Sequence, residues 1–325
     1  MLALAAVATP ALAGTKRARI VLYNGFGTTA GARLGGRVLE DKPHGKAKKK
    51  ESWYRKLRRN ISALESDEIP NVALEVTVLG KKHRVKADDE GLFRLTLKGP
   101  LTLGDHPVTA RLIGKRPYRT EPSRLQVWPK KPGVVVISDI DDTVLDTKVT
   151  SKARMLKGVL LKSARDLNTF KGAPALFRVW AARGYPMVFV SGSPVNLYTR
   201  LQHFLSLSAF PRAPLMLKEL GKDKLTEQKG YKLRQIKKVL DLLPGYQLIL
   251  VGDSGEADPE VYAAVARKHG RKVLAIGIHR VTDASKRDAR FKGQVLFKKY
   301  RKLAKALCDK GLLTKAEYKK VKKGK

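Results

Sequence analysis

Acidic residues gather where the first of three apolar runs ends. Asp139, Asp141 and Asp142 follow the apolar run at 134–137. A short run of this kind is typical of a fully buried strand. Acids at the end of such a strand are costly unless a cation such as Mg²⁺ offsets their desolvation. An Asp-rich turn is the alternative, because Asp side chains accept hydrogen bonds from nearby backbone N–H groups.

Two further apolar runs end in polar residues. Residues 186–190 lead into the sequence SGSP at 191–194, and residues 247–251 lead into GDSGEAD at 252–258. The carboxyl ends of parallel strands meet at one edge of an open α/β sheet, where ligands bind. Three apolar runs with such ends therefore favour a catalytic site over three unrelated turns.

The residues at these ends supply what phosphoryl transfer requires. Asp139 is the predicted nucleophile, which forms an aspartyl-phosphate. Asp141 is the predicted general acid, which later activates water as a base. Ser191 is predicted to donate its hydroxyl to a phosphoryl oxygen, and Lys232 is predicted to neutralise the phosphate and the Asp pair.

The same segments supply predicted ligands for Mg²⁺ and for the substrate. Asp139 and Asp253 are the main predicted metal ligands, Asp141 belongs to the set, and Asp258 is an additional ligand or a supporting group. The cation would screen the attacking carboxylate from the anionic phosphate. The residues predicted on the substrate side are Thr143, Gly192, Ser193 and Asn196. Alternatively, Thr143 orients Asp141 or steadies the turn, and Asn196 caps the following helix.

Helical patterns alternate with the apolar runs. Helices are expected at 151–168, 173–183, 196–205, 229–243 and 259–269, and a further strand at 273–278. This βαβ alternation predicts a parallel sheet with helices on both faces over residues 133–285. A basic helical extension over 286–325 is expected to pack Leu303, Ala304 and Leu307 on this domain. Its last seven residues are expected to be disordered or to bind a surface.

The first part of the chain has the pattern of a small β domain. Strands are expected at 18–23, 72–79, 83–87, 92–97, 106–112 and 123–128, with a glycine-rich turn after the first. They predict an immunoglobulin-like sandwich over 15–128, followed by a Pro-flanked linker at 129–132. A basic insertion at 42–65 contains an amphipathic helical pattern that suits an anionic membrane surface or packing on its own domain.

Composition narrows the choice of partners. The chain has 325 residues, of which 43% are hydrophobic, enough for two domains with real cores. Its formal charge of +38 predicts attraction to nucleic acid, an anionic membrane surface or phosphorylated substrates. The single cysteine, Cys308, excludes an internal disulfide and a CxxC metal site. Residues 1–14 resemble a processed export signal, so a periplasmic or secreted location is expected, with a cytoplasmic protein as the alternative.

The polar motifs resemble those of the haloacid dehalogenase superfamily. DIDDT at 139–143 is similar to its DxDxT motif, FVSGS at 189–193 to its second motif, and GDSGEAD at 252–258 to its fourth. With VSGSPVNLY and GYKLRQI, residues 134–277 resemble the actin-patch-associated phosphatidate phosphatase family, and the β region resembles the domain that precedes it in bacterial members. The resemblance implies a haloacid-dehalogenase-like fold and Mg²⁺-dependent removal of phosphate from phosphatidate, an anionic phospholipid, to give diacylglycerol.

Two positions depart from the family pattern. Val195 stands where an aromatic residue often follows the Ser-Pro, which affects the shape of the pocket. Tyr231 stands where a His commonly precedes the lysine, which leaves Lys229 as a weaker candidate for the role of Lys232. Neither departure removes a catalytic group.

Two other functions stay open. One is a soluble phosphatase of the same mechanism that acts on a nucleotide or phosphorylated metabolite. The other is a non-enzymatic protein that binds an anionic surface or nucleic acid. Acids at all three strand ends argue against a pure binder of polyanions, and the absence of an RNA-binding aromatic signature argues against a specific nucleic acid. Nothing in the sequence specifies an oligomeric state.

Overall fold

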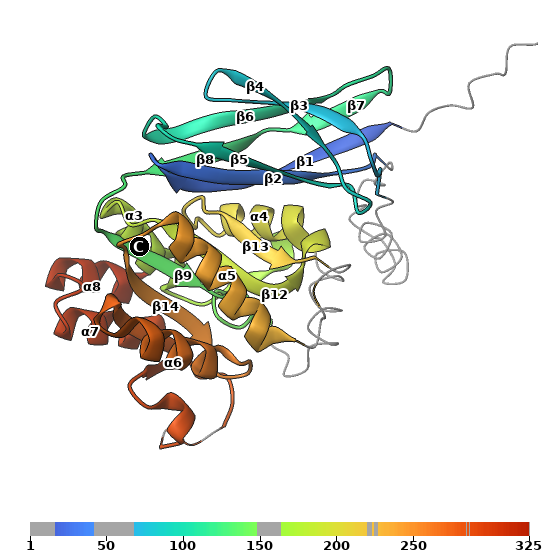
Figure 1. Ribbon diagram of the computed structural model, residues 1–325. Coiled ribbons are helices and arrows are strands. Elements are labelled where there is room, and N and C mark those ends of the chain that lie inside the picture. The colour runs from blue at the N-terminus through green and yellow to red at the C-terminus, as the bar shows by residue number, and fades with distance from the viewer. Residues whose placement is uncertain are drawn as a thin grey trace, which may run out of the picture.

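The computed structural model describes residues 17–41, 68–147, 164–219, 223, 227–283, 285 and 287–324. The expected leader at 1–14 and the basic insertion at 42–65 lie outside these residues, as does most of the helix expected at 151–168. The described residues form a β region and an α/β region, which lie one above the other (Figure 1).

Eight strands make up the β region. They are β1 (Ala18–Thr28), β2 (Gly31–Glu40), β3 (Ala73–Val78), β4 (Lys81–Lys86), β5 (Leu92–Lys98), β6 (Gly104–Leu112), β7 (Tyr118–Glu121) and β8 (Ser123–Trp128). Their hydrogen bonds join them in one sheet in the order β4-β3-β6-β8-β1-β2-β5, with β7 beside β1. Alternate residues such as Ile20, Leu34, Val76 and Val108 meet in one core. Strands β3 and β6 lie above β1 and β2 in Figure 1, while the immunoglobulin-like arrangement stays a prediction.

The glycine-rich segment belongs to strands, so the turn predicted directly after residue 23 is wrong. β1 continues to Thr28, and the turn lies at residues 29–30. A Cβ atom on Gly27 would lie 2.2 Å from the Gly31 carbonyl oxygen, and one on Gly36 would lie 2.5 Å from the Val21 carbonyl oxygen. The neighbouring strands approach so closely here that only glycine fits.

The predicted parallel sheet of the α/β region is confirmed. Its strands are β9 (Val134–Ser138), β12 (Met187–Pro194), β13 (Leu215–Lys218), β14 (Gln247–Asp253), β15 (Val273–His279) and β16 (Val295–Phe297). They are all parallel and follow the order β13-β12-β9-β14-β15-β16. The main helices between them are α3 (Ala173–Ala182), α4 (Tyr198–Leu207), α5 (Gln228–Leu242) and α6 (Asp258–His269).

Helices cover both faces of this sheet because its central strand is apolar on both sides. Val136 of β9 packs in the same core as Trp180 of α3. Its neighbours Val135 and Ile137 point to the opposite face and share a core with Tyr231 of α5. The strand is therefore buried on both faces, as its continuous apolar run predicts. Two short strands, β10 (Leu145–Asp146) and β11 (Asn168–Thr169), pair beside it.

The chain ends in two helices, α7 (Tyr300–Asp309) and α8 (Lys315–Lys323). Leu303 and Leu307 are buried in the core of the α/β region, as their helical spacing predicts. The expectation that the last seven residues are disordered is wrong for those described, because α8 includes residues up to 323. Thr314 and Glu317 cap this helix, and Val321 is buried. None of the described helices is both long and apolar enough to span a membrane.

The two regions meet at β1 and α4. The Tyr198 hydroxyl accepts a hydrogen bond from the Asn24 backbone N–H at 2.7 Å, and the rings of Tyr23 and Tyr198 lie 4.3 Å apart. Figure 1 shows β1 and β2 lying directly above α4 and β13. The first strands of the chain therefore pack on the segment that follows β12.

We expect Tyr198→Phe to lower the free energy of unfolding by about 1–2 kcal/mol, because the half-buried Asn24 N–H loses its acceptor. Urea unfolding of the full chain measures this change. Tyr318→Phe is the control, since Tyr318 lies on α8, away from this contact. An equal loss in both variants would show that the contact between the regions is not the cause.

Candidate active site

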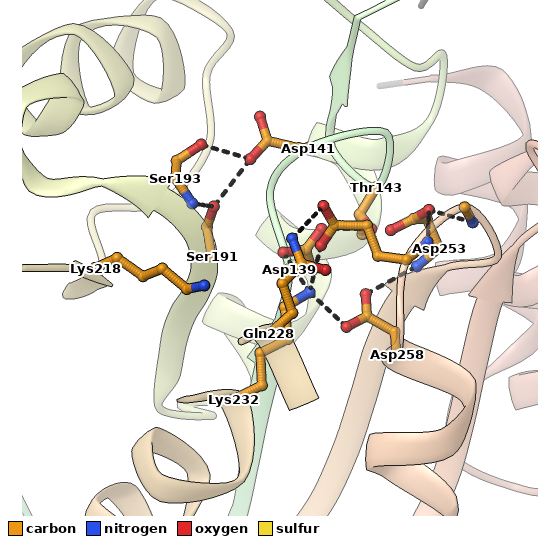
Figure 2. Close-up of polar contacts among 12 residues, drawn as sticks. Asp139, Asp141, Thr143, Ser191, Ser193, Lys218, Gln228, Lys232, Asp253 and Asp258 are labelled. Carbon is orange, nitrogen blue, oxygen red and sulfur yellow. Dashed lines mark hydrogen bonds and ion pairs between the residues drawn. The ribbon is translucent and has the colours of Figure 1, made fainter. Parts of the chain in front are cut away.

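Three strand ends meet at the middle of the sheet. β12, β9 and β14 are neighbours, so the residues at their carboxyl ends lie side by side. Asp139 follows β9, Ser191 lies in the last part of β12, and Asp253 is the last residue of β14. Figure 2 shows the three side chains around one space. The parallel order of the sheet thus brings together residues that are up to 114 positions apart, the separation between Asp139 and Asp253.

Three buried acids form a compact cluster. Asp139, Asp253 and Asp258 each offer a carboxylate oxygen, and these atoms lie within 4.8 Å of one another. Asp258 begins α6, and its Oδ2 accepts the Asp253 N–H at 3.1 Å. A Cβ atom at position 252 would lie 2.3 Å from that same oxygen. Gly252 therefore permits the close approach of Asp258 to β14.

A buried lysine holds these acids together. The Lys232 Nζ of α5 lies 3.0 Å from Asp139 Oδ1, 2.5 Å from Asp258 Oδ1 and 3.2 Å from Glu256 Oε2. Burial disfavours its charged form, but the carboxylates outweigh this effect and raise the pKa of Lys232 well above its usual value. The lysine therefore stays an ammonium at neutral pH.

The weaker lysine candidate lies elsewhere. Lys229 is exposed on α5 and lines a different cavity, together with Glu260 and Arg267. The structure thus brings Lys232, and not Lys229, into the acidic cluster.

The acidic cluster carries more negative than positive charge. Burial raises the pKa of Asp139, Asp253 and Asp258, the neighbouring carboxylates raise it further, and Lys232 partly offsets both effects. The Asp253 Oδ2 atom is buried and has no hydrogen-bond partner among the described residues. A buried carboxylate oxygen that lacks a hydrogen-bond partner is a suitable ligand for a hard divalent cation. Asp139, Asp253 and Asp258 therefore fit a metal site.

Asp141 occupies a separate position. Its Oδ2 accepts hydrogen bonds from Ser191 Oγ at 2.9 Å and Ser193 Oγ at 2.7 Å. Its carboxylate lies outside the three-acid cluster, so its role as a metal ligand stays a prediction. Ser191, expected to donate to a phosphoryl oxygen, donates to Asp141 here. Burial raises the pKa of Asp141 to about 6, so this carboxyl can gain or lose a proton near neutral pH.

Thr143 and Gly192 contact the site from two sides. The Thr143 hydroxyl donates to Asp139 Oδ2 at 3.3 Å, so it orients the predicted nucleophile rather than Asp141. A Cβ atom on Gly192 would lie 3.0 Å from the Gln228 side-chain nitrogen. Gln228, which the sequence patterns did not single out, also donates to Glu256 at 2.8 Å. Its place at the start of α5, four residues before Lys232, is the signal that would have found it.

Asn196 faces the β region. Its Oδ1 accepts a hydrogen bond from Arg37 Nη1 of β2 at 3.2 Å. Its side chain caps neither the 3₁₀ turn at Val195–Leu197 nor α4, so the helix-cap alternative is wrong. Its role in substrate binding stays a prediction. Arg37 was missed because no local pattern links residue 37 to residue 196.

Part of the α/β region matches a known family. Residues 134–280 match the family described as phosphatidate phosphatase APP1, catalytic domain. This segment is therefore similar to that catalytic domain. The match includes the strand ends that carry Asp139, Ser191 and Asp253, together with Lys232. The resemblance seen in the motifs is therefore confirmed.

Two fungal proteins are similar to the APP1-like segment. Phosphatidate phosphatase APP1 of Saccharomyces cerevisiae is 32% identical over 152 residues, which cover 45% of this chain and 26% of the yeast protein. An uncharacterized protein of Schizosaccharomyces pombe is 28% identical over 153 residues, which cover 46% of this chain and 25% of that protein. The chain thus spans about a quarter of the length of these curated relatives.

Solved structures resemble this chain only distantly. A class C acid phosphatase from Bacillus anthracis with tungstate bound has 15% identity and a TM-score of 0.31, covering 59% of this chain and 78% of its own. A putative beta-phosphoglucomutase from Thermotoga maritima has 12% identity and a TM-score of 0.37, covering 54% of this chain and 99% of its own. Scores this low support no argument about function.

We expect Asp141→Asn to raise the free energy of unfolding at about pH 7.5. The folded pKa of about 6 lies above the usual 3.8, so the stability from this group is complete below about pH 4 and is lost as the pH rises through 6. Asn keeps an oxygen acceptor for the two serines and cannot ionise. The gain should approach about 3 kcal/mol at pH 7.5 and vanish near pH 4.

Urea unfolding at the two pH values, with EDTA present, measures the effect of Asp141→Asn. The control is Asp309→Asn, which changes an exposed carboxylate of α7. A difference between Asp141→Asn and the native chain that is the same at both pH values would contradict the raised pKa.

Proposed function

We propose that this chain is a Mg²⁺-dependent phosphatase that hydrolyses a phosphomonoester, with phosphatidate as its substrate and diacylglycerol as the product. The observation that carries the proposal is the buried Asp139, which lies between the Lys232 ammonium and the Thr143 hydroxyl and beside Asp253. The match of residues 134–280 to the APP1 catalytic domain supports the same reaction.

The first step transfers the phosphoryl group to the protein. A carboxylate oxygen of Asp139 attacks the phosphorus, an oxygen–phosphorus bond forms, and the bond from phosphorus to the ester oxygen breaks. The protonated carboxyl of Asp141 gives its proton to the leaving alkoxide, which departs as an alcohol. A pKa of about 6 leaves Asp141 able to hold that proton near neutral pH.

The second step releases the phosphate. The Asp141 carboxylate, now unprotonated, takes a proton from water, and the water oxygen attacks the phosphorus of the aspartyl-phosphate. The bond to Asp139 breaks and inorganic phosphate leaves. Lys232 keeps its positive charge throughout, and Ser191 and Ser193 hold the Asp141 carboxylate in place. Asp139, Asp253 and Asp258 would hold a Mg²⁺ ion, whose charge would screen the nucleophile from the phosphate.

The proposed substrate rests on the family and on charge. Phosphatidate is the substrate named for the yeast relative, and the formal charge of +38 favours contact with an anionic membrane surface. Peripheral membrane contact and a periplasmic or secreted location are part of the proposal. A soluble phosphate ester is the alternative substrate, because the catalytic residues are the same for both.

Mg²⁺ is expected to raise the melting temperature of the native chain, and Asp253→Asn should remove most of this rise. The variant replaces a metal-binding carboxylate by an amide, while the fold keeps Asp139 and Asp258. Because burial raises the pKa of these acids, protons compete with the cation, and the rise should grow from about pH 5 to about pH 8.

Thermal melting with Mg²⁺ or EDTA measures this effect. Asp241→Asn is the matched control, since it removes an exposed carboxylate of α5 that pairs with Lys237. A rise of equal size in Asp253→Asn and in the control would show that Mg²⁺ binds somewhere else.

Asp139→Asn is expected to lower phosphatase activity by about a thousandfold or more, because an amide is a poor nucleophile. Phosphate release from phosphatidate in mixed micelles, measured beside a panel of soluble phosphate esters, tests the reaction and the substrate together. Asp241→Asn should keep the native activity. Substantial turnover by Asp139→Asn would refute the assignment of Asp139 as the nucleophile. Faster turnover of a soluble ester than of phosphatidate by the native chain would refute phosphatidate as the substrate.

A further inference from the structure

The α/β region has a basic cavity that none of the residues of the acidic cluster lines. Its volume is about 610 Å³, within the range of about 300–1,000 Å³ that is typical of small-molecule sites. Two of its walls are α5 and α6, which pack side by side on one face of the sheet (Figure 1). A third wall is formed by residues 289–293, between β15 and β16.

Three cationic side chains line the basic cavity, and each comes from a different wall. They are Lys229 of α5, Arg267 of α6 and Lys292 of the segment before β16. All three are exposed, and none of these side chains forms a hydrogen bond or an ion pair with any residue that the structure describes. Like charges around one concave space reinforce the potential inside it, so the cavity attracts anions.

The one carboxylate of the lining is already neutralised. Glu260 Oε1 accepts a hydrogen bond from Arg290 Nε at 2.8 Å, and its Oε2 accepts one from Arg290 Nη2 at 3.0 Å. The same guanidinium donates to the carbonyl oxygens of Ser254 and Glu256, which hold it against the loop after β14. The lining contains four cations and one carboxylate, so its formal charge is +3.

The remaining lining residues leave room for a ligand. Ala263 and Ala266 of α6 and Gly293 are small, and the buried Ile276 of β15 adds an apolar surface. Lysine binds a phosphate group as a point charge, and arginine binds two of its oxygens at once. The chemistry of this cavity therefore suits a phosphate group attached to a small body.

We propose that the basic cavity is a second anion site that binds a phosphate group with two or more negative charges. Lys229, Arg267 and Lys292 contact the phosphate oxygens, while Arg290 stays paired with Glu260. The phosphate group belongs either to a lipid head group or to a soluble compound, since both present the same oxygens. The proposal goes beyond the phosphatase reaction, because none of these cations contacts the acidic cluster and the site requires no metal ion.

Calorimetry with pyrophosphate, the full chain and EDTA at about 150 mM salt tests the site. EDTA keeps metal ions out of the acidic cluster, which then repels the anion. A variant without the three unpaired cations should bind pyrophosphate about tenfold or more weakly, because three charge-assisted contacts are lost. Its changes are Lys229→Met, Arg267→Met and Lys292→Met.

The matched control removes one arginine and two lysines that are exposed on α7 and α8. Its changes are Arg301→Met, Lys302→Met and Lys319→Met. This control has the same net charge as the cavity variant and should bind pyrophosphate like the native chain. An equal loss in both would overturn the proposal, because the affinity would then reflect net charge alone.

A second variant keeps every cation and guards against a folding defect. Ala289→Glu adds a carboxylate to the cavity lining at an exposed position, so we expect it to fold and to bind pyrophosphate more weakly. Ala316→Glu, at an exposed position of α8, is its control and should keep the native affinity. Native affinity in Ala289→Glu or in the folded cavity variant would overturn the proposal.

Sedimentation with phosphatidylcholine vesicles that contain or lack phosphatidate, again with EDTA, distinguishes the two sources of the phosphate group. Weaker binding of the cavity variant than of its control to the phosphatidate vesicles would support the site and identify a lipid head group. Equal vesicle binding, together with the loss of pyrophosphate binding, would support the site and identify a soluble phosphate compound.

Discussion

The buried ammonium of Lys232 is the interaction on which the site depends. It contacts Asp139 after β9, and it contacts Glu256 and Asp258 in the segment that leads from β14 into α6, so one side chain of α5 connects two separate segments. Removing one partner from a buried ion pair costs about 3–5 kcal/mol, since the remaining charge is left without compensation. Lys232 also lowers the pKa of Asp139 against the effect of burial, which helps this proposed nucleophile to ionise.

One ammonium does not balance the carboxylates around it. Asp139, Asp253, Asp258 and Glu256 all contribute negative charge, and their mutual repulsion adds to the cost of burial. The position of Lys232 between Asp139 and Asp258 leaves Asp253 Oδ2 without a partner among the described residues. Asp139, Asp253 and Asp258 would hold a divalent cation, which would supply the missing positive charge. Charge balance within this cluster therefore supports the proposed metal site.

The sequence predicts the arrangement of the strand ends better than the contacts of their side chains. Apolar runs and helical periodicity are local patterns, and the parallel order of the sheet then forces Asp139, Ser191 and Asp253 together. The hydrogen bonds of Asp141 were not predictable in this way. Asp141 lies two residues after Asp139, where its carboxylate could accept a hydrogen bond from Ser191 or bind a metal ion. Only the packed structure distinguishes these two partners.

Contacts between distant segments were the main gap in the sequence analysis. The glycines of β1 and β2 were interpreted as a turn because glycine is common in turns, whereas the close approach of neighbouring strands requires them here. The contact of Arg37 with Asn196 bridges 159 positions in the chain. This contact and the packing of Tyr198 on β1 attach the segment after Ser193 to the β region. The acidic cluster is instead positioned by α5, α6 and β14. The acidic cluster and the segment after Ser193 are therefore supported by different parts of the chain.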